Sequence, residues 1–259
     1  AIVIKLGGAA MSNIDNLSSF ARDIVLMKQC KVNPIIIHGG GPMINNALNI
    51  WGVNFNFIDG KRVTDKKAVK IVEMVLSGDL NKNIVSSINN QGGKGVGISG
   101  KDASLVICEK DTPELGYVGK PILVNTKLIT TLVENDFIPV ISPIGTNEEG
   151  ETFNINADTM AGTIASALKA DRLLLLTDVS GVRDKSGKKI EKASTEEIKK
   201  LIKQDIIKDG MIPKVNTAIE SIEKGVRAVV ILDGSIQNAC LLELFTDHGV
   251  GTLIREEMN

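Results

Sequence analysis

A lysine inside a short apolar run is the first residue of this sequence that suggests chemistry. Lys5 lies within Ile2–Leu6 and is followed by the pair Gly7-Gly8. Burying an ammonium group without a partner is costly, so Lys5 either meets solvent on an edge strand or binds an anion. Glycine has no Cβ atom, so backbone N–H groups at the pair can approach an anion. The pattern favours phosphate binding by Lys5, Gly7 and Gly8.

A second glycine turn follows the next apolar run. His38 precedes Gly39, Gly40 and Gly41, and Pro42 can occupy the first turn of a helix over residues 43–50. The N-terminus of a helix carries partial positive charge and exposed N–H groups, which suits an anion. Glycine after a strand is usually only turn geometry. Two such turns in one chain, one beside a lysine, favour a phosphate site.

Two further charged residues have ordinary explanations when they are considered alone. Lys214 follows a proline at the start of a predicted helix and, alone, is a surface lysine. Asp158 lies at the start of an alanine-rich helix, where the helix dipole favours an acid without any catalytic role. The residues themselves leave both alternatives open.

Segment 95–100 matches the dinucleotide-binding pattern G-x-G-x-x-G, and Lys101 extends it to a near P-loop. Both motifs must open a helix, whereas residues 101–107 predict a turn and a strand. Asp102 also stands where a P-loop needs the Ser or Thr that binds Mg²⁺. We therefore interpret this segment as a glycine-rich strand and turn.

Alternating strands and helices must position these residues. Continuous apolar runs predict buried strands, and apolar residues at helical spacing predict the helices that follow them. Examples are the strands over 2–6, 34–37, 172–176 and 228–232, and the helices over 16–29, 157–168, 194–204, 215–224 and 239–245. Ser194 and Glu197 have the spacing of a capping box. Residues 66–76 predict a helix, and residues 81–90 predict its continuation or a second helix. Such alternation predicts an α/β fold, a three-layer αβα sandwich with a mostly parallel central sheet. In these folds, function concentrates beyond the carboxyl ends of the strands.

Composition excludes several classes of partner. The 259 residues carry 30 basic and 31 acidic side chains, which argues against a general polyanion-binding surface and predicts no nucleic-acid partner. The longest apolar runs are far shorter than the ~20 residues of a membrane-spanning helix, so no membrane partner is predicted. Three scattered cysteines and two histidines predict neither a disulfide framework nor a protein metal site, and they fit a reducing, cytoplasmic setting.

Six segments in this order resemble the amino-acid kinase superfamily, and most specifically its acetylglutamate branch. They are K-L-G-G at 5–8, H-G-G-G-P at 38–42, G-K-R-V-T-D at 60–65, N-I-N-A-D at 154–158, L-L-T-D-V-S-G-V at 175–182 and G-M-I-P-K-V at 210–215. The resemblance covers essentially the whole chain. It implies phosphorylation of the γ-carboxylate of N-acetyl-L-glutamate by ATP, the second step of arginine biosynthesis from glutamate.

The resemblance also implies roles for individual residues. Lys5 and Lys214 would converge on the transferring phosphoryl group, and Asp158 would hold both ammonium groups in place. Arg62 would bind the α-carboxylate of the substrate and Asn154 its acetylamino end. Backbone N–H groups of Gly8, Gly39 and Gly40 would bind phosphoryl and substrate oxygens.

Nucleotide binding is implied for the C-terminal half of the chain. The resemblance predicts an N-terminal lobe over residues 1–168, for acetylglutamate binding and dimerisation, and a C-terminal lobe over 169–259, for ATP. Mg²⁺ would be bridged mainly by ATP phosphates. The nucleotide contacts map to Thr177, Asp178, Val179, Ser180, Gly181, Val182, Arg183, Ile207, Lys208 and Met211.

Several features leave alternatives open. Lys61 stands where a leucine is expected, and Asp209 replaces a common glycine. The chain begins at its first strand, which predicts a homodimer, or a hexamer if an N-terminal helix is missing; arginine regulation stays open. A plastid interior would follow if a transit peptide had been removed. The rival functions are transfer to aminoadipate, carbamate or aspartate, which Arg62, Asn154 and the loop after Gly8 would discriminate, and a non-catalytic nucleotide-binding regulator.

Overall fold

The computed structural model describes residues 1–8, 11 and 13–257, and these form two compact units. The first unit combines Ala1–Pro34 with Ala161–Asn259, and the second is Ile35–Met160. This division differs from the predicted lobes 1–168 and 169–259, because the N-terminal strand and helix group with the C-terminal part of the chain. The functional roles of those two lobes stay a prediction.

The first unit is built on a mostly parallel sheet. Its strands lie in the order β12 (Lys192–Ser194), β14 (Thr252–Arg255), β13 (Val229–Asp233), β11 (Arg172–Thr177) and β1 (Ile2–Leu6). β1, β11 and β13 are parallel to one another, β12 is parallel to β14, and β13 is antiparallel to β14. Apart from the half-buried Arg172 and Asp233 at their ends, the residues of the central strands β11 and β13 are buried, which explains why these strands appear in the sequence as unbroken apolar runs.

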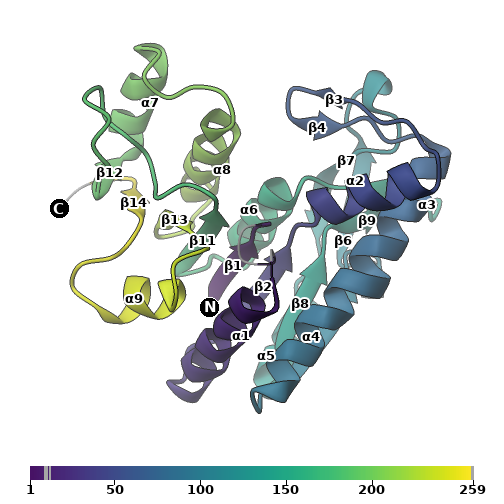
Figure 1. The fold of residues 1–259 in the computed structure, drawn as a ribbon, viewed down its shortest axis with the longest axis horizontal. Helices are drawn as coiled ribbons and strands as arrows, with labels where there is room; N and C mark the ends of the chain where they lie inside the picture. Colours follow the sequence, from purple (N-terminus) through teal and green to yellow (C-terminus); the bar gives the residue numbers. More distant parts are fainter. Residues whose placement is uncertain (9–10, 12, 258–259) are drawn as a thin grey trace. The chain divides into compact units, whose positions relative to one another are not determined.

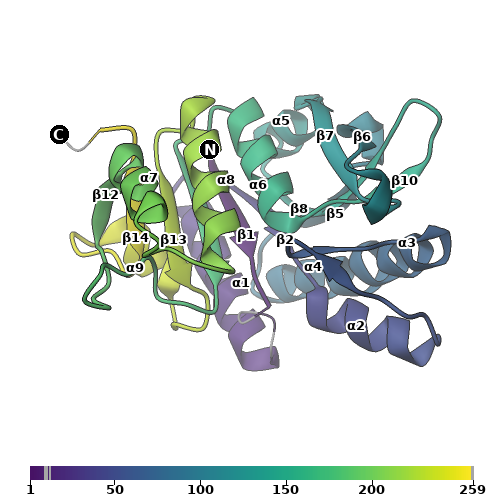
Figure 2. The ribbon, with the colours of Figure 1, turned by 90° about the horizontal axis from the view of Figure 1, so that it is seen from above.

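Helices cover both faces of this sheet. α1 (Ile14–Gln29) and α9 (Ala239–Phe245) lie side by side on one face, while α7 (Thr195–Lys203) and α8 (Met211–Glu223) lie on the other (Figures 1 and 2). The predicted capping box of α7 is confirmed, because Ser194 and Glu197 each bond the other's backbone N–H.

The second unit also has a parallel core. β2 (Pro34–His38), β8 (Ile138–Ser142) and β5 (Gly95–Ser99) lie in that order. Between α3 (Lys66–Glu73) and α4 (Asn81–Asn90) the helix continues as a π-helix, Met74–Leu80. This long helix and α2 (Gly41–Ile50) lie on one side of the core, and α5 (Lys127–Glu134) lies on the other (Figure 2).

Two smaller sheets complete the second unit. One has the order β10 (Thr152–Asn154), β9 (Ile144–Thr146), β6 (Val106–Lys110), β7 (Gly119–Val124); the other is the hairpin β3 (Phe57–Ile58)–β4 (Lys61–Arg62). After β5 the chain forms a short 3₁₀ turn, Asp102–Ser104. Asp102 accepts bonds from the Ser99 N–H and hydroxyl at 2.6 and 2.8 Å. The glycine-rich segment is therefore a strand and a turn, as the sequence predicts.

The predicted fold class is confirmed in both units, since each has a mostly parallel sheet with helices on its two sides. α6 (Ala157–Ala167), the alanine-rich helix, spans the boundary between the two ranges of residues. Within the part of the chain that the structure describes, no helix is both long and apolar enough to span a membrane.

Candidate active site

Lys5 lies near the carboxyl end of β1, as predicted, with its Cα paired to Leu175 of β11. The residue is only 9% exposed, so the alternative of a solvent-exposed edge lysine is wrong. Gly7 follows where the chain passes close to β11, because a Cβ atom on Gly7 would lie 2.4 Å from the Leu176 carbonyl oxygen. The structure thus has a buried lysine close to a glycine turn, as the sequence predicts. Any other residue at Gly7 would require the backbone of β1 or β11 to shift.

The turn after β11 carries most of the predicted nucleotide residues. The Thr177 hydroxyl donates to Asp178 at 3.0 Å, and the Thr177 carbonyl accepts from the Gly234 N–H at 2.8 Å. Further along, the Val182 N–H donates to the Thr252 hydroxyl at 2.9 Å. Thr252, on β14, therefore fixes the turn that ends at Gly181 and Val182. Sequence reasoning did not assign it this role, because the partners lie 70 residues apart.

The remaining predicted nucleotide residues surround the start of α8. Ile207 is buried, whereas Lys208 is exposed and pairs with Asp205 at 2.6 Å. The Met211 N–H donates to the Lys208 carbonyl at 3.2 Å as α8 begins. Lys214, half-buried, lies in the first turn of that helix. Like Lys5, these residues belong to the first unit.

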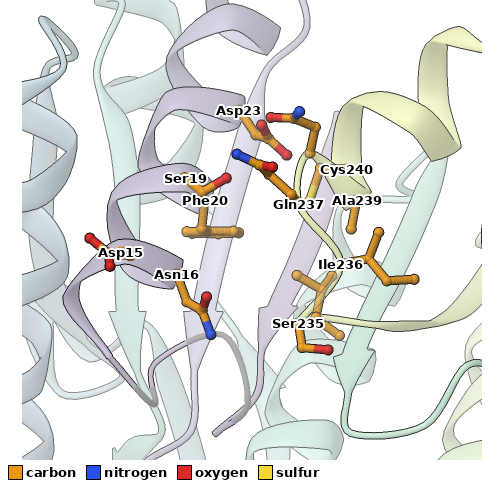
Figure 3. Close-up of a pocket in the computed structure, with 13 residues that line it drawn as sticks. Asp15, Asn16, Ser19, Phe20, Asp23, Ser235, Ile236, Gln237, Ala239 and Cys240 are labelled. Carbon is orange, nitrogen blue, oxygen red and sulfur yellow. The ribbon is translucent and has the colours of Figure 1, made fainter.

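A cavity of about 210 Å³ opens between α1 and the segment that joins β13 to α9 (Figure 3). None of the predicted site residues is among the described residues that line it. Asp23 of α1 is buried here and accepts hydrogen bonds from the backbone N–H groups of Cys240 and Leu241, so it ties α1 to the start of α9. Burial raises the pKa of Asp23 to about 6.

In the second unit, the glycine turn after β2 is held by a buried histidine. His38 Nδ1 lies 2.8 Å from the Gly39 carbonyl oxygen, which can only accept, so Nδ1 carries the proton. Nε2 must then accept from the Asn81 side-chain amide at 3.3 Å. Gly40 packs against the π-helix, since a Cβ atom there would lie 2.5 and 2.6 Å from methyl groups of Leu80 and Leu76.

His38 gives the protein a pH-dependent stability. Burial lowers the pKa of His38 to about 4, whereas an unfolded histidine has a pKa near 6.5. Between about pH 6.5 and pH 4, the unfolded chain binds a proton at His38 that the folded protein does not bind. The free energy of unfolding is therefore unaffected by His38 above about pH 6.5 and falls by roughly 3 kcal/mol in total as pH falls toward 4. We expect the melting temperature of the wild type to fall more steeply over this interval than that of His38→Gln. Parallel pH curves for the two proteins would contradict this expectation.

Arg62 lies on β4 and is only 7% exposed. Its Nη2 donates to the Gly41 carbonyl oxygen at 3.4 Å, which links it to the glycine turn. Its Nη1 is buried and has no hydrogen-bond partner among the described residues. Burial lowers the pKa of the guanidinium, yet arginine stays charged in proteins. A buried fork with an unsatisfied donor is suited to a carboxylate.

Asn154 is brought next to Arg62 through a threonine. The Asn154 amide donates to the Thr64 hydroxyl at 3.3 Å, and that hydroxyl donates to the Arg62 carbonyl oxygen at 2.8 Å. Thr64 is fully buried, and sequence reasoning did not single it out. Lys61 pairs with Asp111, so the unexpected charge at position 61 is balanced within the second unit.

Asp158 lies in the first turn of α6, where the side chain of Asn156 accepts from the Asp158 and Thr159 N–H groups at 2.9 and 3.1 Å. Asn156 therefore caps this helix, and Asp158 itself is only 8% exposed. Serving the helix dipole does not require burial, so that role alone does not explain Asp158. Its catalytic role stays a prediction.

Two further predictions concern a metal site and the loop after Gly8. Among the described residues, no cluster of three or more His, Cys, Asp or Glu side chains could hold a metal ion. The loop after Gly8, which the sequence suggests for acceptor choice, includes residues 9, 10 and 12 and lies largely outside the described residues.

The fold and the sequence define the class to which this protein belongs. The profile of the amino acid kinase family matches residues 1–233, and the chain belongs to that family. A solved structure from Streptococcus mutans is 32% identical, with a TM-score of 0.83, over 99% of this chain and 98% of that one. Giardia lamblia carbamate kinase bound to AMP-PNP has the same fold, with a TM-score of 0.73 at 19% identity over 99% of this chain and 98% of that one.

Similarity within the family is more specific. A protein of Dinoroseobacter shibae named acetylglutamate kinase is 57% identical over 98% of this chain and 88% of its own length. Another of that name, from Paracoccus denitrificans, is 54% identical over 98% of this chain and 84% of its own length. The resemblance to the acetylglutamate branch is thereby confirmed, and the protein is a kinase.

Proposed function

We propose that this protein transfers the γ-phosphoryl group of ATP to the γ-carboxylate of N-acetyl-L-glutamate, a step of arginine biosynthesis. The observation that carries the proposal is the buried Arg62 fork, with its unsatisfied Nη1, beside a glycine turn and Asn154. The acceptor is a dicarboxylate with an amide, and these groups match its two ends. High identity to proteins named acetylglutamate kinase supports the same acceptor.

On the acceptor side, each group has a distinct task. Arg62 pairs with the α-carboxylate, because its planar fork gives two parallel hydrogen bonds. Asn154 bonds the acetylamino group and is itself oriented by Thr64. Backbone N–H groups at Gly39 and Gly40 bind the γ-carboxylate, in a turn whose shape His38 maintains.

On the nucleotide side, the turn from Thr177 to Arg183, together with Ile207, Lys208 and Met211, binds the nucleoside part of ATP. Gly7 and Gly8 present N–H groups to the phosphates. We assign Mg²⁺ to the phosphate oxygens of ATP and to no protein ligand. When bound, the ion neutralises phosphate charge.

The reaction needs charge neutralisation more than proton transfer. A γ-carboxylate is already ionised at neutral pH, so no general base is required. Both reactants are anionic, and catalysis therefore depends on positioning and on cations at the transferring group. We assign these cations to Lys5 and Lys214, and the placement of their ammonium groups to Asp158.

An acceptor panel tests the proposal. ADP release would be followed with ATP and Mg²⁺, and hydroxylamine would trap the acyl phosphate. N-acetyl-L-glutamate would be compared with glutamate, aspartate, N-acetyl-aminoadipate and carbamate. Turnover confined to N-acetyl-L-glutamate supports the proposal. Turnover with another acceptor would discard the roles of Arg62 and Asn154, and ATP binding without any turnover would indicate a regulator.

Replacing Arg62 by lysine should weaken acceptor binding more than chemistry. The substitution keeps the charge but loses the second hydrogen bond to the carboxylate, so we expect KM for N-acetyl-L-glutamate to rise roughly 20-fold, with kcat changed by less than threefold. Steady-state kinetics at saturating ATP would measure both. Arg227→Lys is the matched control, because Arg227 is exposed and pairs with Asp171 at 3.2 Å. An unchanged KM would exclude Arg62 from the acceptor site.

The assembly state is also a proposal. We propose a homodimer, with a hexamer as the alternative that the sequence leaves open. Sedimentation of the purified chain over a range of concentrations would separate the two, and a monomer at all concentrations would contradict both.

A further inference from the structure

Two phenylalanine rings enclose the Arg62 guanidinium. Its central carbon lies 4.9 Å from the centroid of the Phe55 ring and 4.7 Å from that of the Phe57 ring. The rings meet edge to face, with centroids 6.2 Å apart and planes at 87°. Both distances lie within the ~6 Å over which a cation is attracted to an aromatic face. One arginine therefore has two aromatic contacts.

Strand pairing produces this arrangement. Phe57 is the direct partner of Arg62 across the β3–β4 hairpin, and the Val63 N–H bonds the Asn56 carbonyl at 2.9 Å. Phe55 packs against the apolar cluster that contains Leu48, Leu76 and Leu80, so one side of the enclosure is anchored in the core. The other side, Phe57, is half-exposed, at 51%.

Core packing alone does not account for Phe57. An aromatic side chain that is half in solvent gains little from burial, yet it lies over a cation that is itself only 7% exposed. The two rings remove water from the guanidinium without offering it a hydrogen bond. Its Nη1 stays unsatisfied, while Nη2 donates to Gly41. The enclosure therefore orients the fork and preserves its capacity for a ligand.

We infer that Phe55 and Phe57 are positioning residues that hold the Arg62 guanidinium ready for a carboxylate of the acceptor. This inference rests on the proposed function, since it assigns Arg62 to acceptor binding. The rings act through their aromatic faces, not merely through their volume. A guanidinium that is already desolvated and oriented loses less conformational freedom when the carboxylate binds. The rings should therefore affect KM for the acceptor and not kcat.

Two substitutions at Phe57 separate aromatic character from volume. Phe57→Leu keeps an apolar side chain but removes the ring face, whereas Phe57→Tyr keeps it. We expect Phe57→Leu to raise KM for N-acetyl-L-glutamate about fivefold, with kcat and KM for ATP changed by less than twofold. Phe57→Tyr should restore the wild-type KM. Phe137→Leu, at an exposed phenylalanine outside the hairpin, is the control that should change nothing.

A second measurement tests the contact without acceptor. We expect Phe57→Leu to lower the melting temperature when Arg62 is present and to leave it unchanged in an Arg62→Met background. Equal KM values for the leucine and tyrosine variants would overturn the inference, and so would equal melting shifts in the two backgrounds. If the wild type shows no turnover with N-acetyl-L-glutamate, the proposed function fails, and the melting cycle still decides whether the rings hold Arg62.

Discussion

Lys5→Met lowers kcat by about a thousandfold and leaves the fold intact: this is the largest effect that we expect on activity. The proposed reaction moves a phosphoryl group between two anions, and a cation that acts only in the transition state contributes to kcat. Methionine has an unbranched apolar side chain like the aliphatic part of lysine, and Lys5 is only 9% exposed on β1. The substitution therefore removes the charge without leaving a void.

Steady-state kinetics and thermal melting would be measured on the same preparation. Lys192→Met is the matched control, because Lys192 is also a strand lysine of the first unit but is exposed at the start of β12. The control should retain wild-type kcat. If Lys5→Met retained kcat within tenfold, the lysine would have no catalytic role. If the Lys5→Met protein unfolded, Lys5 would be a structural residue whose charge is needed for folding.

Local patterns in the sequence were sufficient to single out several residues of the candidate site. Lys5 was identifiable because a lysine interrupts an apolar run, and the structure places it in a buried strand. The glycine turns were visible as residue types, and the start of α7 as a capping box. Each of these signals depends on neighbours within a few positions, so one sequence contains all of the information.

Contacts between distant segments were not predictable in this way. Thr252 fixes the turn at Val182 from 70 residues away, and nothing near position 252 indicates this. The aromatic enclosure of Arg62 was missed for a different reason. Phe55 and Phe57 alternate at strand spacing, but only the two-residue strands β3 and β4 bring the rings onto the arginine.

Helix boundaries show the same limit. The sequence left open whether residues 66–90 form one helix or two, because Gly78 interrupts the pattern. The structure continues the helix through a π-helix, Met74–Leu80, and Leu76 and Leu80 from it pack at Gly40. α8 begins at Met211, not at residue 215 as predicted, because Pro213 is tolerated within the first helical turn. In both cases tertiary packing or backbone geometry decided what residue preferences left open.

We expect Gly7→Ala to cause a large loss of stability. The added Cβ atom would lie 2.4 Å from the Leu176 carbonyl oxygen, which is backbone and cannot rotate away. β1 or β11 must shift to relieve the overlap, at a cost of about 2–3 kcal/mol, typical of overpacking. For a chain of this size, that corresponds to a melting temperature lower by roughly 5–10 °C. Because Lys5 lies two residues away on β1, we also expect kcat to fall at least tenfold.

Thermal melting and steady-state kinetics of the same variant would check both expectations. Gly210→Ala is the control, because a Cβ atom on Gly210 would meet nothing within 4 Å and its φ of −62° suits alanine. The control should melt at or slightly above the wild-type temperature, since alanine restricts the unfolded chain. A Gly7→Ala protein that melts with the control would show that the two strands have room for a methyl group. The close approach would then not be what requires glycine at this turn, and phosphate contact would remain as its reason.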